Sequence, residues 1–527
     1  MPPVKSLGRL LLPAFLLSAA ARAPAGSVPM SVSDVSNVLA QAVTRASQIS
    51  VNSVVAVVDR EGFVLGVWSV NGTTPATAAF TGLVANAIAK AGTASFLSSD
   101  EHAFSSRTAG FIVQQNFPPG VQNKPPGPLV GVNFSNLSFS DVNRYKDPRT
   151  FVPGLSGGTN GAPVPTPITG GLAGTPGGVP LFKNGHLVGG VGVAGDGDGP
   201  FDITPQTIAN PDVDEDVALA GQTGFAPPEF LFGSHVLIDG IRVAYVNSTT
   251  SLGAVSPLGS SGVVVPPFTL AASPGPIVYP TMTLGGQTCE VRQPIMDDSS
   301  TVPLGVPRLT AADVSQMLDL ASRRARTTRA GIRLPRGKAV QVFVTVVNNP
   351  ATDGATPVVL GTIRTPDATI FSWDVAVQKA RTAVFFSNNT RAYSSRTVGF
   401  MAQGLYPPGI AGTSPGIFCG LQERFSVVTP ASVMFTNPLN GCVFFTSTSA
   451  NPNLQNSITI FPGGFPLYRD GVLIGAIGVS GDGIDQDDIV GASGSAPFVA
   501  PEGIRADRFA YRGARLPFAK FPRNPAL

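Results

Sequence analysis

The stretch GGVPLFKNGHLVGGVGVAGDG at residues 177–197 decides the fold, because it returns at residues 463–483 as GGFPLYRDGVLIGAIGVSGDG. In each version two apolar runs flank an Asn-Gly or Asp-Gly pair, which is a strong signal for a two-residue hairpin turn. The two stretches therefore predict the same β-hairpin at two places in the chain.

Other segments repeat at nearly the same spacing. SSRTAGF at residues 105–111 returns as SSRTVGF at residues 394–400, and PPGV at 118–121 returns as PPGI at 407–410, both with an offset of 289. A period near 290 is far longer than the roughly 20–50 residues of a solenoid repeat. The chain is thus predicted to hold two domains of one fold, and a residue that carries chemistry is expected in both.

Each copy has the same predicted element order. An amphipathic helix starts near Ser31, with Ser33 or Asp34 as its expected cap, or at Thr310 in copy two. A β-hairpin, a second helix, a short SSRT helix, a long loop, the repeated hairpin and a final helix follow. This order predicts an α+β fold, in which two copies of an antiparallel sheet are flanked by helices. Long loop insertions are expected at residues 118–176 and 407–462, with no role assigned.

The N-terminus is typical of a signal peptide. Lys5 and Arg9 precede an apolar run at residues 10–21, and small residues follow before residue 25. A membrane anchor is the other interpretation, but a span needs about 20 apolar residues. We expect a secreted or periplasmic protein. The predicted division is 1–25 signal peptide, 31–245 domain 1, 246–306 linker, 307–512 domain 2 and 513–527 C-terminal tail.

Composition argues against a nucleic-acid partner and leaves one disulfide bond undecided. Charged residues make up only 13% of the chain, and all three basic residues of segment 1–25 leave with it, so the mature chain is neutral. Nucleic-acid binding needs clustered positive charge, so no nucleic-acid partner is expected. In an oxidising compartment Cys419 and Cys442 would close a loop, whereas three unpaired thiols that include Cys289 are the alternative.

Several motifs together resemble one known family. They are VAVVDREG at residues 55–62, KAGTA at 90–94, KARTA at 379–383 and the repeated hairpin. This set is similar to the GlcG/HbpS-like haem-binding family, which includes the C-terminal domains of PduO-type proteins, over 110–130 residues of each copy. The resemblance implies a secreted tandem protein that binds, stores or senses haem or a similar tetrapyrrole. It also implies that the copies pack as an intramolecular pseudo-dimer, with higher oligomers left open.

The resemblance also implies a candidate binding wall. Lys90, Thr93, Lys379, Arg381 and Thr382 match the KARTA segment, and they would offer cations and hydroxyls to a tetrapyrrole and its propionates. Copy one has Gly92 where copy two has the arginine. The other interpretation is a helix whose basic side chains are solvated.

Further candidates are less evenly shared. Arg107 and Arg396 recur and would suit an anionic group, although capping a helix or tying down the loop is favoured for them. No histidine is common to both copies, because Arg391 and Val472 occupy the copy-two positions of His102 and His186. His102 is the best single candidate for an axial ligand. Tyr393 and Tyr406 are weaker candidates in copy two.

Other chemistry finds little support in the sequence. The GDGDG at residue 195 and GDGIDQDD at residue 481 fail the spacing of an EF-hand loop and suit a tight turn before a helix, so a metal site stays undetermined. The G-x-S-x-G pattern occurs at residues 154–158 and 412–416, but both lie inside the long loop insertions and not at the strand-to-helix turn that a nucleophile elbow needs. The acids of residues 485–488 suit a helix start. With no catalytic constellation, the alternative to haem binding is a ligand-free structural or interaction module of the cell envelope.

Overall fold

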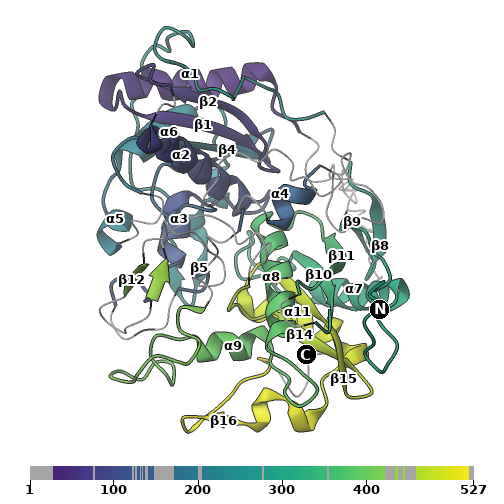
Figure 1. The fold of residues 1–527 in the computed structure, drawn as a ribbon. Coiled ribbons are helices and arrows are strands. Elements are labelled where there is room, and N and C mark those ends of the chain that lie inside the picture. The colour runs from purple at the N-terminus through teal and green to yellow at the C-terminus, as the bar shows by residue number, and fades with distance from the viewer. Residues whose placement is uncertain are drawn as a thin grey trace, which may run out of the picture.

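A computed structural model describes residues 28–421, 434–436, 443–445 and 458–520, with internal gaps. The gaps are residues 75–76, 115, 122–123, 125–126, 131, 133–134, 137–139, 148–170, 200–203, 276–277 and 353–354. The predicted signal peptide, Cys442 and much of both loop insertions lie outside the described residues. In Figure 1 copy one, purple to teal, lies above copy two, green to yellow.

Copy one is built on a five-stranded antiparallel sheet in the order β3-β4-β1-β2-β7. Helices α1 and α6 pack on one face of this sheet and α2 packs on the other, while the short α3 and α5 lie beyond them. The strands are β1 (Val54–Asp59), β2 (Val64–Ser69), β3 (Gly178–Lys183), β4 (His186–Ala194) and β7 (Val263–Val264). The helices are α1 (Val32–Ile49), α2 (Ala78–Phe96), α3 (Ser106–Ile112), α5 (Pro205–Ala209) and α6 (Val213–Gly221).

Helices cover both faces of the sheet, which explains the unbroken apolar run of β1. Val55 and Val57 belong to the cluster under α1, whereas Val54 and Ala56 belong to the cluster under α2. Successive side chains of a strand point to opposite faces, so a strand buried on both sides needs apolar residues at every position.

Copy two repeats this arrangement with six antiparallel strands in the order β14-β15-β10-β11-β9-β8. The strands are β8 (Thr281–Leu284), β9 (Gln287–Gln293), β10 (Val342–Asn348), β11 (Val359–Arg364), β14 (Gly464–Arg469) and β15 (Val472–Gly481). The helices are α7 (Ala311–Thr327), α8 (Phe371–Phe385), α9 (Ser395–Met401) and α11 (Ile484–Gly494). A separate two-stranded sheet joins β12 (Met434–Thr436) to β13 (Val443–Phe445). The predicted α+β fold with helix-flanked antiparallel sheets is confirmed.

The predicted cap of the first helix is confirmed in copy two and wrong in copy one, and a serine caps each SSRT helix. Thr310, Ser105 and Ser394 each accept a hydrogen bond from the backbone N–H three residues on. In copy one the cap is Ser31, and Asp34 completes a capping box as the third helical residue. Ser31 is the cap instead of Ser33 or Asp34, because its hydroxyl and the Asp34 carboxylate satisfy two backbone N–H groups reciprocally.

The glycines of the repeated hairpin are required by close packing. A Cβ on Gly192 would lie 2.2 Å from the Ala87 carbonyl oxygen, and one on Gly478 would lie 2.0 Å from that of Ala376. The backbones of α2 and α8 therefore rest directly on their hairpins, and only glycine leaves room for them.

The segment predicted as a linker, residues 246–306, extends both sheets. Strand β7 pairs with β2 through Trp68 and Val264, and β9 pairs with β11 through Thr362 and Gln293. Figure 1 shows β8 and β9 running beside α7 at the edge of copy two. The chain between the copies thus belongs to the folded core of each.

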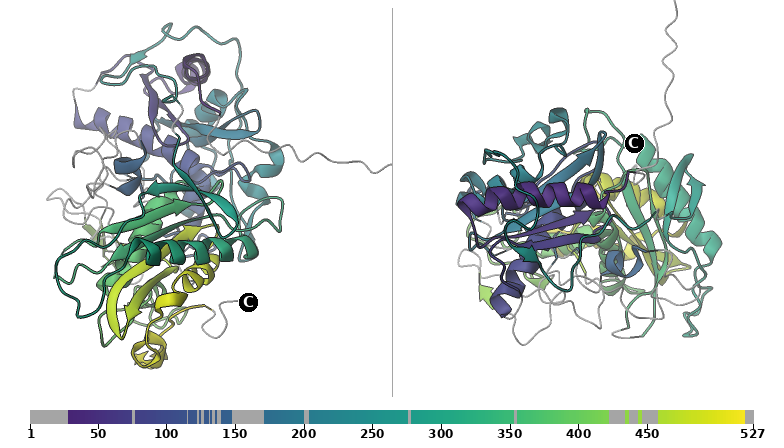
Figure 2. Two further views of the ribbon diagram at one scale, coloured as in Figure 1. Left: turned by 90° about the vertical axis from the view of Figure 1, so that its right-hand side faces the viewer. Right: turned by 90° about the horizontal axis from the view of Figure 1, so that it is seen from above.

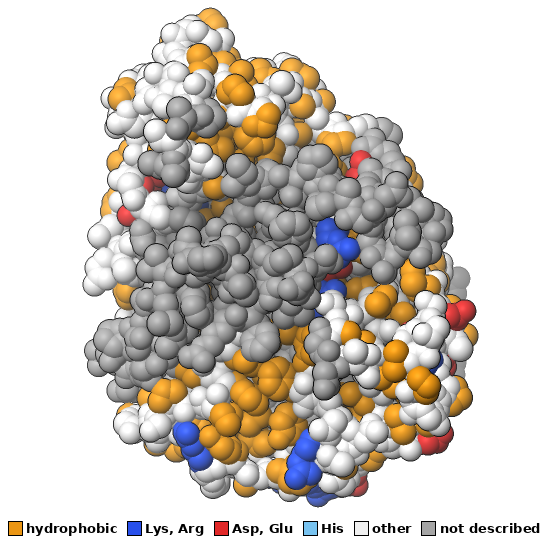
Figure 3. Space-filling view, viewed as in Figure 1, with side chains coloured by type: hydrophobic (Ala, Val, Ile, Leu, Met, Phe, Trp, Pro, Cys, Tyr) orange, Lys and Arg blue, Asp and Glu red, His pale blue; other side chains and the backbone are white. Residues whose placement is uncertain are grey.

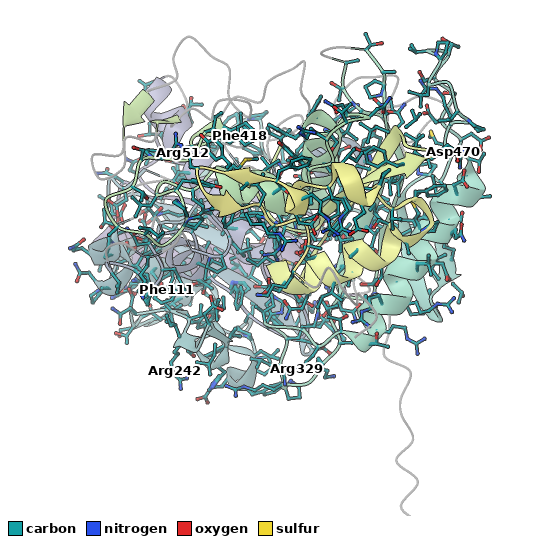
Figure 4. All side chains as sticks on the ribbon, turned by 90° about the horizontal axis from the view of Figure 1, so that it is seen from below. Phe111, Arg242, Arg329, Phe418, Asp470 and Arg512 are labelled. Atoms are coloured by element: carbon teal, nitrogen blue, oxygen red, sulfur yellow. The ribbon has the colours of Figure 1, made fainter. Side chains whose placement is uncertain are left out.

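In each copy the structural repeat continues beyond the last repeated sequence motif. After η4 (Glu229–Leu231) and η5 (Gly233–His235), copy one forms a small hairpin of β5 (Leu237–Ile238) and β6 (Ile241–Arg242). After η6 (Ala496–Phe498), η7 (Glu502–Ile504) and η8 (Ala506–Arg508), copy two forms β16 (Ala510–Tyr511) and β17 (Ala514–Arg515). Figure 4 marks the two hairpins by Arg242 and Arg512.

In each copy the segment after the small hairpin packs against the SSRT helix. Thr108 Oγ1 donates to the Ala244 carbonyl at 2.7 Å, and Thr397 Oγ1 donates to the Pro517 carbonyl at 2.6 Å. Ser105 and Ser394 donate to the next carbonyls, those of Tyr245 and Phe518. The start of the predicted tail is therefore part of copy two.

The two copies pack directly against each other (Figure 2). One apolar cluster contains Phe96 and Phe104 from copy one together with Phe343 and Trp373 from copy two. Asp374 of α8 also accepts hydrogen bonds from the backbone N–H groups of Asn136 and of Val142, the latter in α4 (Asp141–Tyr145). Fused copies that share an interface agree with the expected packing, whereas its identity with a family dimer stays a prediction.

Copy two has ten more residues than copy one between its first helix and its first core strand. Strand β10 starts 15 residues after the end of α7, whereas β1 starts 5 residues after the end of α1. The resulting loop, residues 328–341, carries the buried Arg333 into the interface, where the Leu334 N–H donates to the Glu101 carbonyl at 2.9 Å.

Three surface and covalent features complete the description. Figure 3 shows hydrophobic side chains gathered over the region of α9 and β16. None of the described helices combines the length and apolar character that a membrane crossing needs. Cys419 is disulfide-bonded and Cys289 is a buried free thiol, which agrees with the bonded interpretation of the sequence for Cys419.

Candidate functional site

The two lysines of the KARTA match are buried in equivalent ion pairs. Lys90 Nζ lies 2.8 Å from Asp214 Oδ2, and Lys379 Nζ lies 2.7 Å from Asp487 Oδ2. Each carboxylate stands in the first turn of the final helix of its copy, as predicted for these acids. Burial raises the pKa of both Asp214 and Asp487 to about 7. The pairs join the second helix to the last one.

The two SSRT arginines make a second pair of equivalent ties. Arg107 holds Glu215 with Nε 2.8 Å and Nη2 2.9 Å from its two oxygens. Arg396 Nε lies 2.6 Å from Asp488 Oδ2, and its Nη2 lies 2.8 Å from Asp485 Oδ1. Both arginines therefore tie the SSRT helix to the final helix of its copy, and whether they also bind an anionic group stays a prediction.

The two threonines of the KARTA match bind the chain that enters the hairpin. Thr93 Oγ1 accepts the Ala173 N–H at 2.8 Å and donates to the Ala89 carbonyl. Thr382 Oγ1 accepts the Thr459 N–H at 3.0 Å and donates to the Gln378 and Thr459 carbonyls. Both hydroxyls are fully buried.

Arg381 crosses to the other copy. Its Nη1 lies 3.6 Å from Asp141 Oδ2 in α4, and its side chain is only 4% exposed. At the matching position of copy one, a Cβ on Gly92 would lie 3.1 Å from the Asn136 side chain. Copy two thus has an arginine where α8 contacts the loop of copy one, and copy one has a glycine where the side chain of Asn136 leaves little space.

His102 is enclosed and uses both ring nitrogens. Nδ1 lies 2.9 Å from Ser99 Oγ and Nε2 lies 2.8 Å from the Leu97 carbonyl oxygen. Burial, with the nearby Arg333 guanidinium as the next cause, lowers the pKa of His102 to about 3. In copy two, Tyr406 Oη donates to the Tyr511 carbonyl at 3.0 Å.

The structure brings forward His186, which the sequence argument passed over in favour of His102. His186 starts β4, its side chain is 24% exposed, and its Nδ1 lies 2.8 Å from Asp100 Oδ2. Asp100 is itself held in place, because Oδ1 accepts hydrogen bonds from Arg60 Nη1 and the Leu187 N–H. A carboxylate on Nδ1 fixes the ring and leaves Nε2 as the acceptor, which is the arrangement of many metal-ligating histidines. No signal in the sequence pairs these residues, which stand 86 positions apart.

Comparison with known proteins settles the family. The family model described as "Haem degrading protein HbpS-like" matches residues 30–203 and 309–496. The chain belongs to this family. The resemblance inferred from the repeated hairpin and the KARTA segment is therefore confirmed, and HbpS-like domains are present in tandem.

Curated and solved relatives match 30–39% of the HbpS-like chain. Corrinoid adenosyltransferase PduO of Salmonella typhimurium is 26% identical over 160 residues, which is 30% of this chain and 33% of that protein. A solved PduOC:heme complex is 26% identical over 36% of this chain and 94% of that one, with a TM-score of 0.23. A double mutant of HbpS from Streptomyces reticuli is 17% identical over 39% and 96%, with a TM-score of 0.22. The chain thus spans about a third of the curated relative.

Haem is the group that the HbpS-like family implies, so its fit can be tested against the donors present. The eight residues predicted for a tetrapyrrole are all engaged inside the protein: Lys90, Thr93, His102, Arg107, Lys379, Arg381, Thr382 and Arg396. Their part in ligand binding stays a prediction. His186 fits better, because its imidazole is partly exposed and Asp100 holds its Nδ1, which leaves Nε2 as the ring nitrogen that can act as a ligand.

Proposed function

We propose that this protein binds haem or a related tetrapyrrole, and that His186 of copy one is its protein ligand. The observation that carries the proposal is the HbpS-like family match, which covers both copies. Bound haem would supply an iron that an imidazole nitrogen can ligate. Storage or sensing of haem is the role that such binding would serve.

The surroundings of His186 favour iron ligation over a purely structural role. Asp100 accepts a hydrogen bond from Nδ1, which holds the proton there and leaves Nε2 as the ring nitrogen that can bind iron. The same carboxylate is bound to Arg60, and Arg60 also pairs with Asp367 of copy two. The ring is therefore oriented by a carboxylate that copy one itself holds, and Arg60 links that carboxylate to Asp367 of copy two.

The proposal predicts one haem per chain. Copy two has Val472 at the position of His186, and the corresponding strand carries no imidazole. The test is a haem titration of the full chain followed at the Soret band, with wild type, His186→Ala and His235→Ala. His235 is an exposed histidine at the end of η5, so it controls for nonspecific imidazole ligation.

We expect saturation at one haem per chain, a Soret shift lost in His186→Ala, and wild-type behaviour in His235→Ala. Saturation at two per chain, or an unchanged spectrum in His186→Ala, would overturn the assignment of His186. A chain with no saturable binding would favour the second candidate, a ligand-free interaction module. The internal pairing of all eight predicted residues is the observation that supports this second candidate.

We also propose that the mature protein is secreted or periplasmic. The support is the signal-like segment 1–25 together with the disulfide at Cys419, since disulfides persist in oxidising compartments. Mass spectrometry of the exported chain tests this. A mature N-terminus near residue 26 is expected, and an intact N-terminus on cytoplasmic protein would refute it.

A further inference from the structure

Positive charge is concentrated where the first helix of copy two ends. The stretch SRRARTTRAGIRLPRGK at residues 322–338 holds seven basic residues and no acid, in a mature chain that is neutral as a whole. Five of the seven are exposed, and we call them the cationic surface: Arg323, Arg326, Arg329, Arg336 and Lys338. Such a block of like charge is typical of a segment that binds an anionic partner.

The backbone holds the second half of this stretch beside the first. After the last residue of α7 the chain of residues 328–340 folds back as a hairpin, in which the Ala330 N–H donates to the Lys338 carbonyl at 2.9 Å. The hairpin is anchored by Arg333, whose buried guanidinium pairs with Asp482. Its exposed basic side chains are therefore held next to those in the last turns of α7.

Acids compensate only part of the cationic surface. Arg323 Nη2 lies 2.7 Å from Asp319 Oδ2, and Lys338 Nζ lies 3.1 Å from Glu101 Oε1. The other three members, all arginines, form no ion pair with any residue that the structure describes. The surface thus presents three uncompensated positive charges to the solvent.

Copy one shows that the fold does not need these charges. The last turns of α1 carry Thr44 and Ser47 at the positions of Arg323 and Arg326, and no hairpin follows them before β1. The arginine of α1, Arg45, is neutralised by two hydrogen bonds to an acid of α6, at 2.9 and 2.7 Å. Helix and sheet pack alike in the two copies, so the cationic surface is an addition of copy two.

The dipole of α7 explains only part of this addition. Cations in the last turn of a helix are stabilising, which accounts for Arg326. The effect falls off within that turn, so it does not account for Arg336 or Lys338 in the hairpin. Their charge is therefore available to a partner outside the chain.

The composition of the stretch indicates the class of partner. Four of the five exposed members are arginines, whose planar guanidinium groups bind phosphate through two N–H donors. Residues 322–338 contain no aromatic side chain on which a nucleic-acid base could stack. Their large apolar side chains, Ile332 and Leu334, are buried and cannot form the apolar centre of a protein interface. A surface of closely spaced phosphates fits these features, and the proposed export brings the chain beside lipid headgroups.

We propose that the cationic surface attaches this protein to membranes that contain anionic phospholipids. The attachment is peripheral, because it depends on the attraction between exposed basic side chains and headgroup phosphates. It is also sensitive to salt, since charges in water are screened within about 8 Å at physiological ionic strength. Copy two supplies this surface, whereas copy one supplies the histidine proposed for haem.

The test is co-sedimentation of the full chain, without haem, with two kinds of vesicle. One kind contains phosphatidylglycerol and phosphatidylcholine in equal parts, and the other contains phosphatidylcholine alone. Wild type is compared with Arg329→Gln/Arg336→Gln, which removes two exposed charges that no described acid compensates. The matched control is Arg391→Gln/Arg512→Gln, at two exposed arginines of copy two outside the cationic surface, and Figure 4 shows Arg512 apart from Arg329. Equal thermal unfolding of the three proteins establishes that they are folded alike.

We expect wild type to bind the anionic vesicles and not the neutral ones, with a bound fraction that falls as NaCl is added. The affinity should weaken about tenfold or more in Arg329→Gln/Arg336→Gln and stay at the wild-type value in the control. No binding, equal binding to both kinds of vesicle, binding that salt leaves unchanged, or equal weakening in the two variants would each overturn the proposal. Duplex DNA bound more tightly than the anionic vesicles would also overturn it and assign the surface to nucleic acid. Because no haem is present, this proposal and the haem proposal can fail separately.

Discussion

Arg333 and Asp482 form an ion pair in which both side chains are fully buried, although Arg333 belongs to a loop that copy one lacks. Arg333 Nη1 also lies 2.8 Å from Asp367 Oδ2 and within reach of Glu101 of copy one. One inserted arginine therefore neutralises an acid of its own domain and joins that domain to its neighbour.

Replacing Arg333 should be strongly destabilising. Arg333→Met leaves Asp482 buried without its counter-charge, and breaking such a pair costs about 3–5 kcal/mol of the free energy of unfolding. Urea unfolding of the full chain measures it. Arg336→Met, an exposed arginine of the same loop, is the control and should stay within about 0.5 kcal/mol of wild type. Equal losses in the two variants would contradict the role given to Arg333.

The Lys379–Asp487 pair is predicted to respond differently to single and double replacement. Lys379→Met should lose about 3–5 kcal/mol, because it leaves the Asp487 carboxylate buried and unpaired. Lys379→Met/Asp487→Leu should recover much of that loss, since both desolvated charges are then gone. Lys338→Met, at a lysine that is 43% exposed and paired with Glu101, should lose no more than about 1 kcal/mol.

Haem titration of the same lysine variants separates structure from ligand binding. If Lys379 serves only the fold, the double variant should bind haem like wild type. A double variant that is stable but has lost haem binding would instead support the lysine as a ligand contact.

The SSRT hydroxyls are predicted to hold the returning chain of each copy. Ser105→Ala removes both the cap of α3 and the hydrogen bond to the Tyr245 carbonyl, and Ser394→Ala does the same at Phe518. Each should cost about 1–2 kcal/mol, with faster amide exchange in the docked segment. Ser47→Ala, at an exposed serine of α1, should be nearly neutral. Faster exchange in that control as well would refute the local explanation.

His102 should make the chain less stable in acid. Its pKa falls from 6.5 to about 3 on folding, so the unfolded chain binds a proton that the folded chain refuses between these values. The stability that the neutral ring contributes is complete above pH 6.5 and is lost as the pH falls toward 3.

Comparison with His102→Gln isolates this contribution. Between pH 7.5 and 4.5, wild type should lose roughly 3 kcal/mol more of its free energy of unfolding than the variant does. Denaturant unfolding at both pH values measures the difference. Parallel losses in the two proteins would show that His102 is protonated as readily in the folded chain as in the unfolded one.

Much of the fold follows from local patterns. The Asn-Gly and Asp-Gly turns, the Thr310 cap and the acids that open the final helix of copy two depend on residues a few positions apart, and each is found where it was predicted. Short strands escaped the same reasoning. Strand β7 has two residues and takes its pairing from Trp68 and Ser69, so its own composition carries little signal.

The candidate site was less accessible from sequence, because the partner of a buried charge is set by packing. Lys90 and Asp214 are 124 positions apart, and His186 and Asp100 are 86 apart. Periodicity and motifs identified Lys90 as special without revealing that an acid of the last helix neutralises it. Nothing in the sequence distinguishes His186, because only folding brings its partner Asp100 beside it.

The sequence by itself determined the duplication, the α+β fold and the family, because these depend on repeated spacing, hairpin turns and glycines that a helix backbone requires. Only the tertiary structure decided which charges are compensated. Arg333 reaches Asp482 in copy two, and no described basic side chain reaches Asp196 in copy one. The difference follows burial, because Asp482 is withdrawn from water and needs a partner inside the folded chain, whereas Asp196 is exposed and is solvated instead.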